Sequence, residues 1–226
     1  MAKSLYSVLP SVAMVETWIA GLKDKTGRSL NEWLTVIGRD GPADEKSCRD
    51  WLKRTHRLGS NSAWWLAEMA HGGPDRVAQD TPNGYLRLAP EYVNQQYAGK
   101  KAILRPLYDR LLREALDLGK DVKACPCKTI VPLYRQNVFA QLKPTTNTRI
   151  DLGLALGKVS DAAIRRAGKR LIDTGGKAKK DRLTHRIVIE RIEDIDEFAR
   201  RWLRQAYDLD APTPGRRPPA KPMMRT

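Results

Sequence analysis

The chain lacks the features that would place it in a membrane or hold it together by disulfide bonds. Its 226 residues contain no run of the ~20 consecutive apolar side chains that a membrane-spanning helix needs. The first ten residues contain one lysine and no long apolar stretch, so we expect no secretory signal. Only three cysteines occur, Cys48, Cys125 and Cys127, an odd number without a disulfide framework. These absences predict a soluble cytoplasmic protein with reduced thiols and no membrane partner.

Signals for catalysis, metals and cofactors are equally scarce. One residue separates Cys125 from Cys127, whereas common zinc sites have two, and His185 is distant in sequence. Residues 153–159 do not match a nucleotide-binding phosphate loop. Gly153 and Gly157 are separated by one residue fewer than that motif requires, and Lys158 is not followed by Ser or Thr. Clustered carboxylates and a nucleophile elbow are missing too. We therefore assign no catalytic residue, no metal ligand and no cofactor; a metal-dependent nuclease or another enzyme is the less favoured alternative.

Positive charge, in contrast, is plentiful and unevenly distributed. The chain has 41 Lys and Arg against 26 Asp and Glu, a net charge of +15. Residues 1–99 carry 12 basic and 11 acidic side chains, whereas residues 100–226 carry 29 and 15. Such asymmetry suggests a polyanionic partner for the second half, with simple solubility as the alternative.

Apolar residues at helical spacing predict a small helical domain of about four helices over residues 12–73. Ser29, followed by Glu32, forms a capping box that opens the second helix. The turn at 58–61 between the last two helices is typical of a helix-turn-helix motif. However, residues 62–70 contain no Lys or Arg, which argues against a helix that reads the major groove.

Five of the six tryptophans fall within this helical domain. We expect most of them to build a small aromatic core. Trp65 is expected to be partly exposed, as a contact for a protein partner, and His56 and His71 to lie on the surface. The four tryptophans expected in the core are Trp18, Trp33, Trp51 and Trp64.

The rest of the chain predicts a linker, a second domain and a tail. Residues 74–98 are expected to form a linker with a short helical piece, and residues 211–226, rich in proline and basic, a disordered tail. Residues 100–209 form the second domain, with helices expected over 103–116 and 195–207. The fold class is α+β: an all-α N-terminal domain and a mainly antiparallel sheet packed on two helices. Strands are expected at 129–134, 138–143, 149–154 and 184–190.

A strongly basic stretch lies within the second domain. Residues 158–186 contain ten Lys and Arg and three Asp. Gly175 and Gly176 precede several lysines, which predicts a mobile loop that reaches phosphates without demanding base identity. The alternative is that this stretch is simply a solvated surface loop. Alternation along the strands places further cations on a polar face of the sheet, where the alternative is an ordinary exposed face with a local Arg149–Asp151 pair. The candidate phosphate contacts are Lys143, Arg149, Lys177, Lys179, Lys180, Arg182 and Arg186.

Two resemblances accompany these patterns. Residues 23–30, 32–33 and 51–53 resemble the helical family domain of unknown function 4287. The second domain resembles domain of unknown function 5655, a family similar to proteins once labelled predicted transport proteins, although residues 157–182 depart from its pattern. The resemblance carries over no catalytic or binding residue, and the attachment of this domain to restriction-type nucleases implies a nucleic-acid setting. The matching segments are Lys128-Thr129, Phe139-Ala140, Lys143-Pro144, 148–154, Thr184-His185-Arg186 and Ala206-Tyr207.

We therefore predict a non-catalytic protein that binds DNA or RNA through its basic C-terminal domain. The N-terminal helical domain would be an interaction module with a protein partner. A protein–protein scaffold is the main alternative. Sequence preference and oligomeric state stay open.

Overall fold

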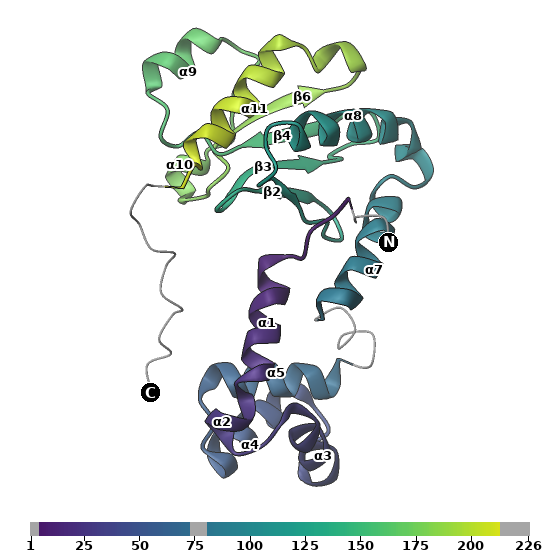
Figure 1. Cartoon of the computed structure of the whole chain (residues 1–226), viewed down its shortest axis with the longest axis vertical. Helices are drawn as coiled ribbons and strands as arrows, with labels where there is room; N and C mark the ends of the chain where they lie inside the picture. The colour runs from purple at the N-terminus through teal and green to yellow at the C-terminus, as the bar shows by residue number, and fades with distance from the viewer. Residues whose placement is uncertain (1–4, 73–80, 213–226) are drawn as a thin grey trace. The chain divides into compact units, whose positions relative to one another are not determined.

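The computed structural model describes residues 5–72 and 81–212, which divide into two compact units (Figure 1). The helical unit comprises residues 8–88 and the sheet unit comprises residues 89–212 together with residues 5–7. Ser7 attaches the start of the chain to the sheet unit, because its backbone N–H donates to the Ala124 carbonyl at 2.9 Å. Beyond residue 212, the predicted disordered tail lies outside the described residues.

The helical unit contains the predicted helices, with one division that the apolar pattern did not show. The first predicted helix is split at Gly21, which belongs to neither α1 nor α2. Gly27 then ends α2 in the left-handed region, at φ 79°, where a residue without a Cβ is favoured. The helices are α1 (Pro10–Ala20), α2 (Leu22–Thr26), α3 (Leu30–Asp40), α4 (Glu45–His56) and α5 (Ser60–His71).

The predicted capping box is confirmed at the start of α3. The Ser29 hydroxyl accepts from the backbone N–H of Glu32 at 3.4 Å, and the Ser29 N–H donates to the Glu32 carboxylate at 2.6 Å. Both contacts satisfy donors that a helix start otherwise leaves without partners.

Replacing this cap is expected to have a moderate effect. Ser29→Ala should lower the unfolding free energy of the helical unit by about 1 kcal/mol, because one orphan N–H of α3 loses its acceptor. Ser60→Ala is the matched control, since the helix start at α5 is not capped by a side-chain hydrogen bond. Urea unfolding followed by circular dichroism compares the two, and equal effects of both substitutions would contradict the capping role.

The tryptophan arrangement differs from the prediction at Trp64, which was expected in the core. Trp64 is 39% exposed, whereas Trp65 packs against Trp18 with ring centroids 5.0 Å apart. The reason is helical geometry: α5 buries Ala63, Leu66, Ala67 and Met69, and Trp64 lies at the border of this buried face. Trp64 is therefore exposed where a core position was expected, whereas Trp65 is partly buried, which agrees with its expected partial exposure.

His56 was also expected on the surface, and the structure corrects this. Its ring stands edge-on to two indoles, with centroids 5.1 Å from Trp33 and 4.6 Å from Trp51. His56 is thus part of the aromatic core, next to Trp33, whose Nε1 donates to the Thr26 hydroxyl at 2.8 Å.

The segment expected to be a linker is more regular than the sequence suggested. Its described part consists mainly of α7 (Pro82–Gln96), which crosses the boundary between the two units. Pro82 begins this helix, where a missing N–H costs no hydrogen bond.

The sheet unit is built on six strands within the described residues, paired antiparallel throughout. Their spatial order is β1-β2-β3-β4-β6-β5. The four predicted strands are confirmed, and two further strands were missed because each has only two residues. The strands are β1 (Lys123–Ala124), β2 (Val131–Tyr134), β3 (Val138–Lys143), β4 (Ile150–Leu154), β5 (Ile172–Asp173) and β6 (His185–Ile189).

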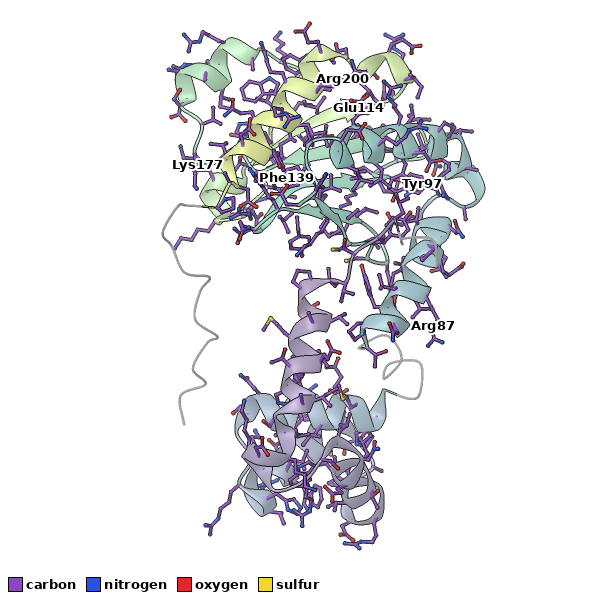
Figure 2. All side chains as sticks on the ribbon, in the orientation of Figure 1. Arg87, Tyr97, Glu114, Phe139, Lys177 and Arg200 are labelled. Carbon is purple, nitrogen blue, oxygen red and sulfur yellow. The ribbon has the colours of Figure 1, made fainter. Side chains whose placement is uncertain are left out.

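Two long helices pack on this sheet, as predicted. The 3-10 helix η1 (Gly99–Leu104) leads into α8 (Arg105–Leu116), which contacts β1, while α11 (Glu197–Leu209) contacts β3 and β4 (Figure 1). The Arg200 guanidinium of α11 lies 3.0 Å from the Glu114 carboxylate of α8, and Figure 2 shows the two side chains together. The α+β fold class is therefore confirmed.

The basic stretch has more structure than a single loop. It contains α9 (Asp161–Ala167), β5 and the four-residue α10 (Gly176–Lys179). The Ser160 hydroxyl caps α9 by accepting from the Ala163 N–H at 3.3 Å. Gly175, at φ 71°, supplies the left-handed turn before α10.

Candidate nucleic-acid interface

Three predicted cations meet on the polar face of the sheet. Lys143 of β3 lies opposite Asp151 of β4 in the strand register. The Asp151 carboxylate accepts from the Arg186 guanidinium at 2.7 Å and from the Thr145 hydroxyl at 2.7 Å, and lies 3.3 Å from the Arg149 Nε. The local pairing of Arg149 with Asp151 is thus present. One carboxylate nevertheless faces three cations, which leaves this part of the sheet positive.

Three other predicted cations line one cavity beside α10, of about 260 Å³, which we call the α10 groove. Neighbouring segments bring the cations together: the turn after β4, α10 itself, and the chain that leads into β6. The floor includes the end of α11. The charged residues of the groove are Lys158, Lys177, Lys180 and Arg182, with Asp181 and Asp210.

The lysines of the groove are held weakly. Lys177 points outward from α10 (Figure 2), and its ammonium lies 3.3 Å from the Asp161 carboxylate, with both side chains about 70% exposed, at 69% and 72%. Such exposed pairs contribute little stability and exchange readily with another anion. The Lys158 ammonium donates to the Leu209 carbonyl at 3.5 Å, and Lys180 has no ion pair within residues 5–72 and 81–212. These ammonium groups can therefore reach a new anionic partner.

Arg182, in contrast, is committed to the fold. Its Nε donates to the Val138 carbonyl at 2.6 Å, and its Nη2 donates to the Asp210 carboxylate. Asp210 is 5% exposed and also accepts from the backbone N–H groups of Gln136 at 3.0 Å and Asn137 at 2.7 Å. Asp210 thus ties the end of α11 to the β2–β3 turn and holds the Arg182 guanidinium in place.

Close packing positions α10 against the strand that follows it. Gly176 is buried, and a Cβ at this position would collide with the Leu183 carbonyl oxygen. The Asp181 N–H donates to the Gly176 carbonyl at 2.8 Å and closes the short helix. Only glycine allows this close contact between α10 and the chain at Leu183. The contact fixes the position of α10, and therefore of the lysines that follow Gly176.

Lys179 was also predicted as a phosphate contact. It is exposed at the end of α10, and no ion pair engages it in the part of the chain that the structure describes. The structure thus brings the predicted residues into two places, the sheet face and the neighbourhood of α10. Lys158 belongs to the basic stretch but is not among the predicted phosphate contacts, because its nearness to α10 depends on the tertiary fold.

A buried histidine lies next to these segments. The Thr184 hydroxyl and the His185 Nδ1 are 2.9 Å apart, and the same hydroxyl accepts from the Leu156 N–H at 3.3 Å. Burial lowers the pKa of His185 below its ordinary value of 6.5, although Asp173 opposes the shift.

This shift predicts a pH dependence of stability. The unfolded chain takes up a proton at His185 near pH 6.5, while the folded chain resists it, so the unfolding free energy should fall as the pH drops below 6.5. His185→Gln should show a smaller loss between pH 7.5 and 5.5. Urea unfolding at both pH values measures the difference, and identical pH dependence in both proteins would contradict it.

Among residues 5–72 and 81–212, no three His, Cys, Asp or Glu side chains are grouped so that they could hold a metal ion. The helices of the same residues include none that is long and apolar enough to span a membrane.

These features define the sheet unit as an α+β domain with an antiparallel sheet, two helices on it and a basic groove at one end. The family model described as Domain of unknown function (DUF5655) matches residues 93–210, more than half of the 226 residues. The chain therefore belongs to this family, as the resemblance of the second domain implied. No match to domain of unknown function 4287 was found, so that resemblance stays a prediction. Searches of curated proteins and of solved structures found no match.

Proposed function

We propose that the protein binds nucleic acid without catalysis, and that the α10 groove is its principal contact with phosphates. The observation that supports this most is that Lys158, Lys177 and Lys180 line one groove beside Arg182. Of the two carboxylates there, Asp210 is already engaged by four donors from three residues. The groove therefore presents more positive charge than its own carboxylates neutralise.

The type of cation indicates the type of recognition. Lysine is a compact point charge on a flexible stem, and suits contacts with phosphates from several directions. Base readout, in contrast, relies on bidentate arginine or amide groups placed at base edges. We infer binding with little sequence preference, to DNA or RNA, with Lys179 as a further contact.

The sheet-face cations would add a second, weaker contact. Arg149 and Arg186 share Asp151, and each guanidinium keeps N–H groups that this carboxylate does not occupy. Lys143 stands beside them without an ion pair among the described residues. Arg182 we assign to holding the groove rather than to contacting phosphate.

A salt titration tests the proposal. Fluorescence anisotropy of the full chain with duplex DNA or RNA should show binding that weakens by about 40-fold between 50 and 200 mM KCl. That loss corresponds to three phosphate contacts, because each contact lowers the slope of the logarithm of the binding constant against the logarithm of the salt concentration by about 0.9. Binding that is absent at low salt, or insensitive to salt, would overturn it.

For the helical unit we infer an interaction role. Trp64 is exposed, with the Arg49 guanidinium 6.0 Å from its ring centroid, an arrangement common at protein contacts. If the protein is instead a scaffold, Trp64→Ala should abolish partner binding while nucleic-acid affinity is negligible. The low cysteine count supports a cytoplasmic location.

A further inference from the structure

A second cavity lies between α9 and α11, and its lining is chemically simple. It has a volume of about 300 Å³, and none of its lining residues lines the α10 groove. Both helices are visible above the sheet in Figure 1. Carboxylates are missing from this lining, which consists of Ala163, Arg166, Ala167, Arg201, Trp202 and Gln205.

Neither of the two guanidiniums of this cavity forms an ion pair with another described residue. Arg166 has no ion pair or side-chain hydrogen bond among residues 5–72 and 81–212. Arg201 lies over aromatic rings, 5.8 Å from the centroids of Phe198 and of Trp202, which position it without consuming its N–H donors. Two positive charges therefore border one cavity with their donors unused.

The indole adds an independent observation. Trp202 is 7% exposed, and its Nε1 has no hydrogen-bond acceptor in the described part of the chain. A buried donor without an acceptor costs free energy, and such groups are uncommon in folded proteins. The cavity is thus lined by a residue with an unsatisfied donor, by two guanidiniums and by the amide of Gln205.

We propose that this cavity binds a phosphate monoester. Such a group carries a charge of about −1.5 to −2 at neutral pH and three acceptor oxygens, which matches two arginines better than a carboxylate does. The volume is at the small end of ligand pockets, as suits a terminal phosphate rather than a continuous backbone. The phosphate could come from a small phosphorylated molecule or from the 5′ end of a nucleic-acid strand.

Isothermal titration calorimetry of the full chain, in phosphate-free buffer, separates these sources. The probes are adenosine 5′-monophosphate, and a short single strand with either a 5′-phosphate or a 5′-hydroxyl. If the site takes small molecules, adenosine 5′-monophosphate should bind. If the site takes the end of a strand, the strand with a 5′-phosphate should bind at least about fivefold more tightly than the strand with a 5′-hydroxyl. Arg166→Gln and Arg201→Gln should each weaken that binding by about tenfold or more.

Arg165→Gln is the matched control, because Arg165 lies on the same helix with the same charge but does not line the cavity. It should change affinity by less than about twofold. Absence of any phosphate preference, or equal losses for Arg165→Gln and Arg166→Gln, would overturn the proposal. Duplex binding with 5′-hydroxyl ends should be unaffected by Arg166→Gln, so failure of this site and failure of the α10 groove are distinguishable.

Discussion

The double substitution Lys177→Glu/Lys180→Glu is expected to weaken nucleic-acid binding on the order of 100-fold at about 50 mM KCl. It removes two cations from the α10 groove and places two anions beside the phosphates that the groove would contact. Both positions are exposed, so the fold should be retained. Anisotropy with duplexes of several sequences should show the same loss for each, since phosphate contacts carry no sequence information.

The control for this experiment changes the net charge by the same amount at another place. Lys120→Glu/Lys123→Glu reverses two exposed lysines next to and within β1, at the opposite edge of the sheet from β5 and the α10 segment that follows it. The control should cost no more than about fivefold, through long-range charge alone. Equal losses in both double variants would show that total charge, and not the groove, determines binding.

Asp210→Ala is expected to lower the unfolding free energy of the sheet unit by about 3 kcal/mol. The substitution leaves the Arg182 guanidinium without its carboxylate and removes the acceptor of the Gln136 and Asn137 N–H groups. Removing this buried acceptor leaves two backbone N–H groups desolvated without a hydrogen-bond partner, whereas the Arg182 guanidinium, on a side chain that is 47% exposed, can turn to water. Urea unfolding measures the global loss.

Hydrogen exchange gives the local readout for this variant. The amides of Gln136 and Asn137 should lose protection in Asp210→Ala beyond the global change, because Asp210 is their acceptor. Asp208→Ala, an exposed position on the same helix, should leave both protection and the urea midpoint nearly unchanged. Unaltered protection in Asp210→Ala would refute the proposed tie between α11 and the β2–β3 turn.

The predictions that succeeded rest on local patterns. The capping box at Ser29 and Glu32 is confirmed because its geometry needs only four consecutive residues. Strands β2, β3, β4 and β6 could be recognised from their β-branched and aromatic residues and from the turns between them, although only β6 alternates strictly between buried and half-buried side chains. Fold class could therefore be predicted without knowledge of the tertiary contacts.

The differences come from features that local patterns do not contain. Trp64 and Trp65 are adjacent and equally apolar, so only the packing of α5 decides which of the two is more exposed. The four-residue α10 depends on the left-handed Gly175 and on the contact of Gly176 with Leu183, neither of which periodicity reveals. Similarly, the pairing of Arg182 with Asp210 joins residues 28 apart in sequence. Composition predicted that the second half is basic, but not which cations the fold would engage.

The most direct test of the α10 groove is an amide ¹H–¹⁵N titration of the full chain with a short duplex. The largest shifts should fall at Lys158 and at residues 176–182, with smaller shifts at Lys143, Arg149 and Arg186. Shifts confined to residues 8–72, or spread evenly over the basic residues of the sheet unit, would contradict this prediction.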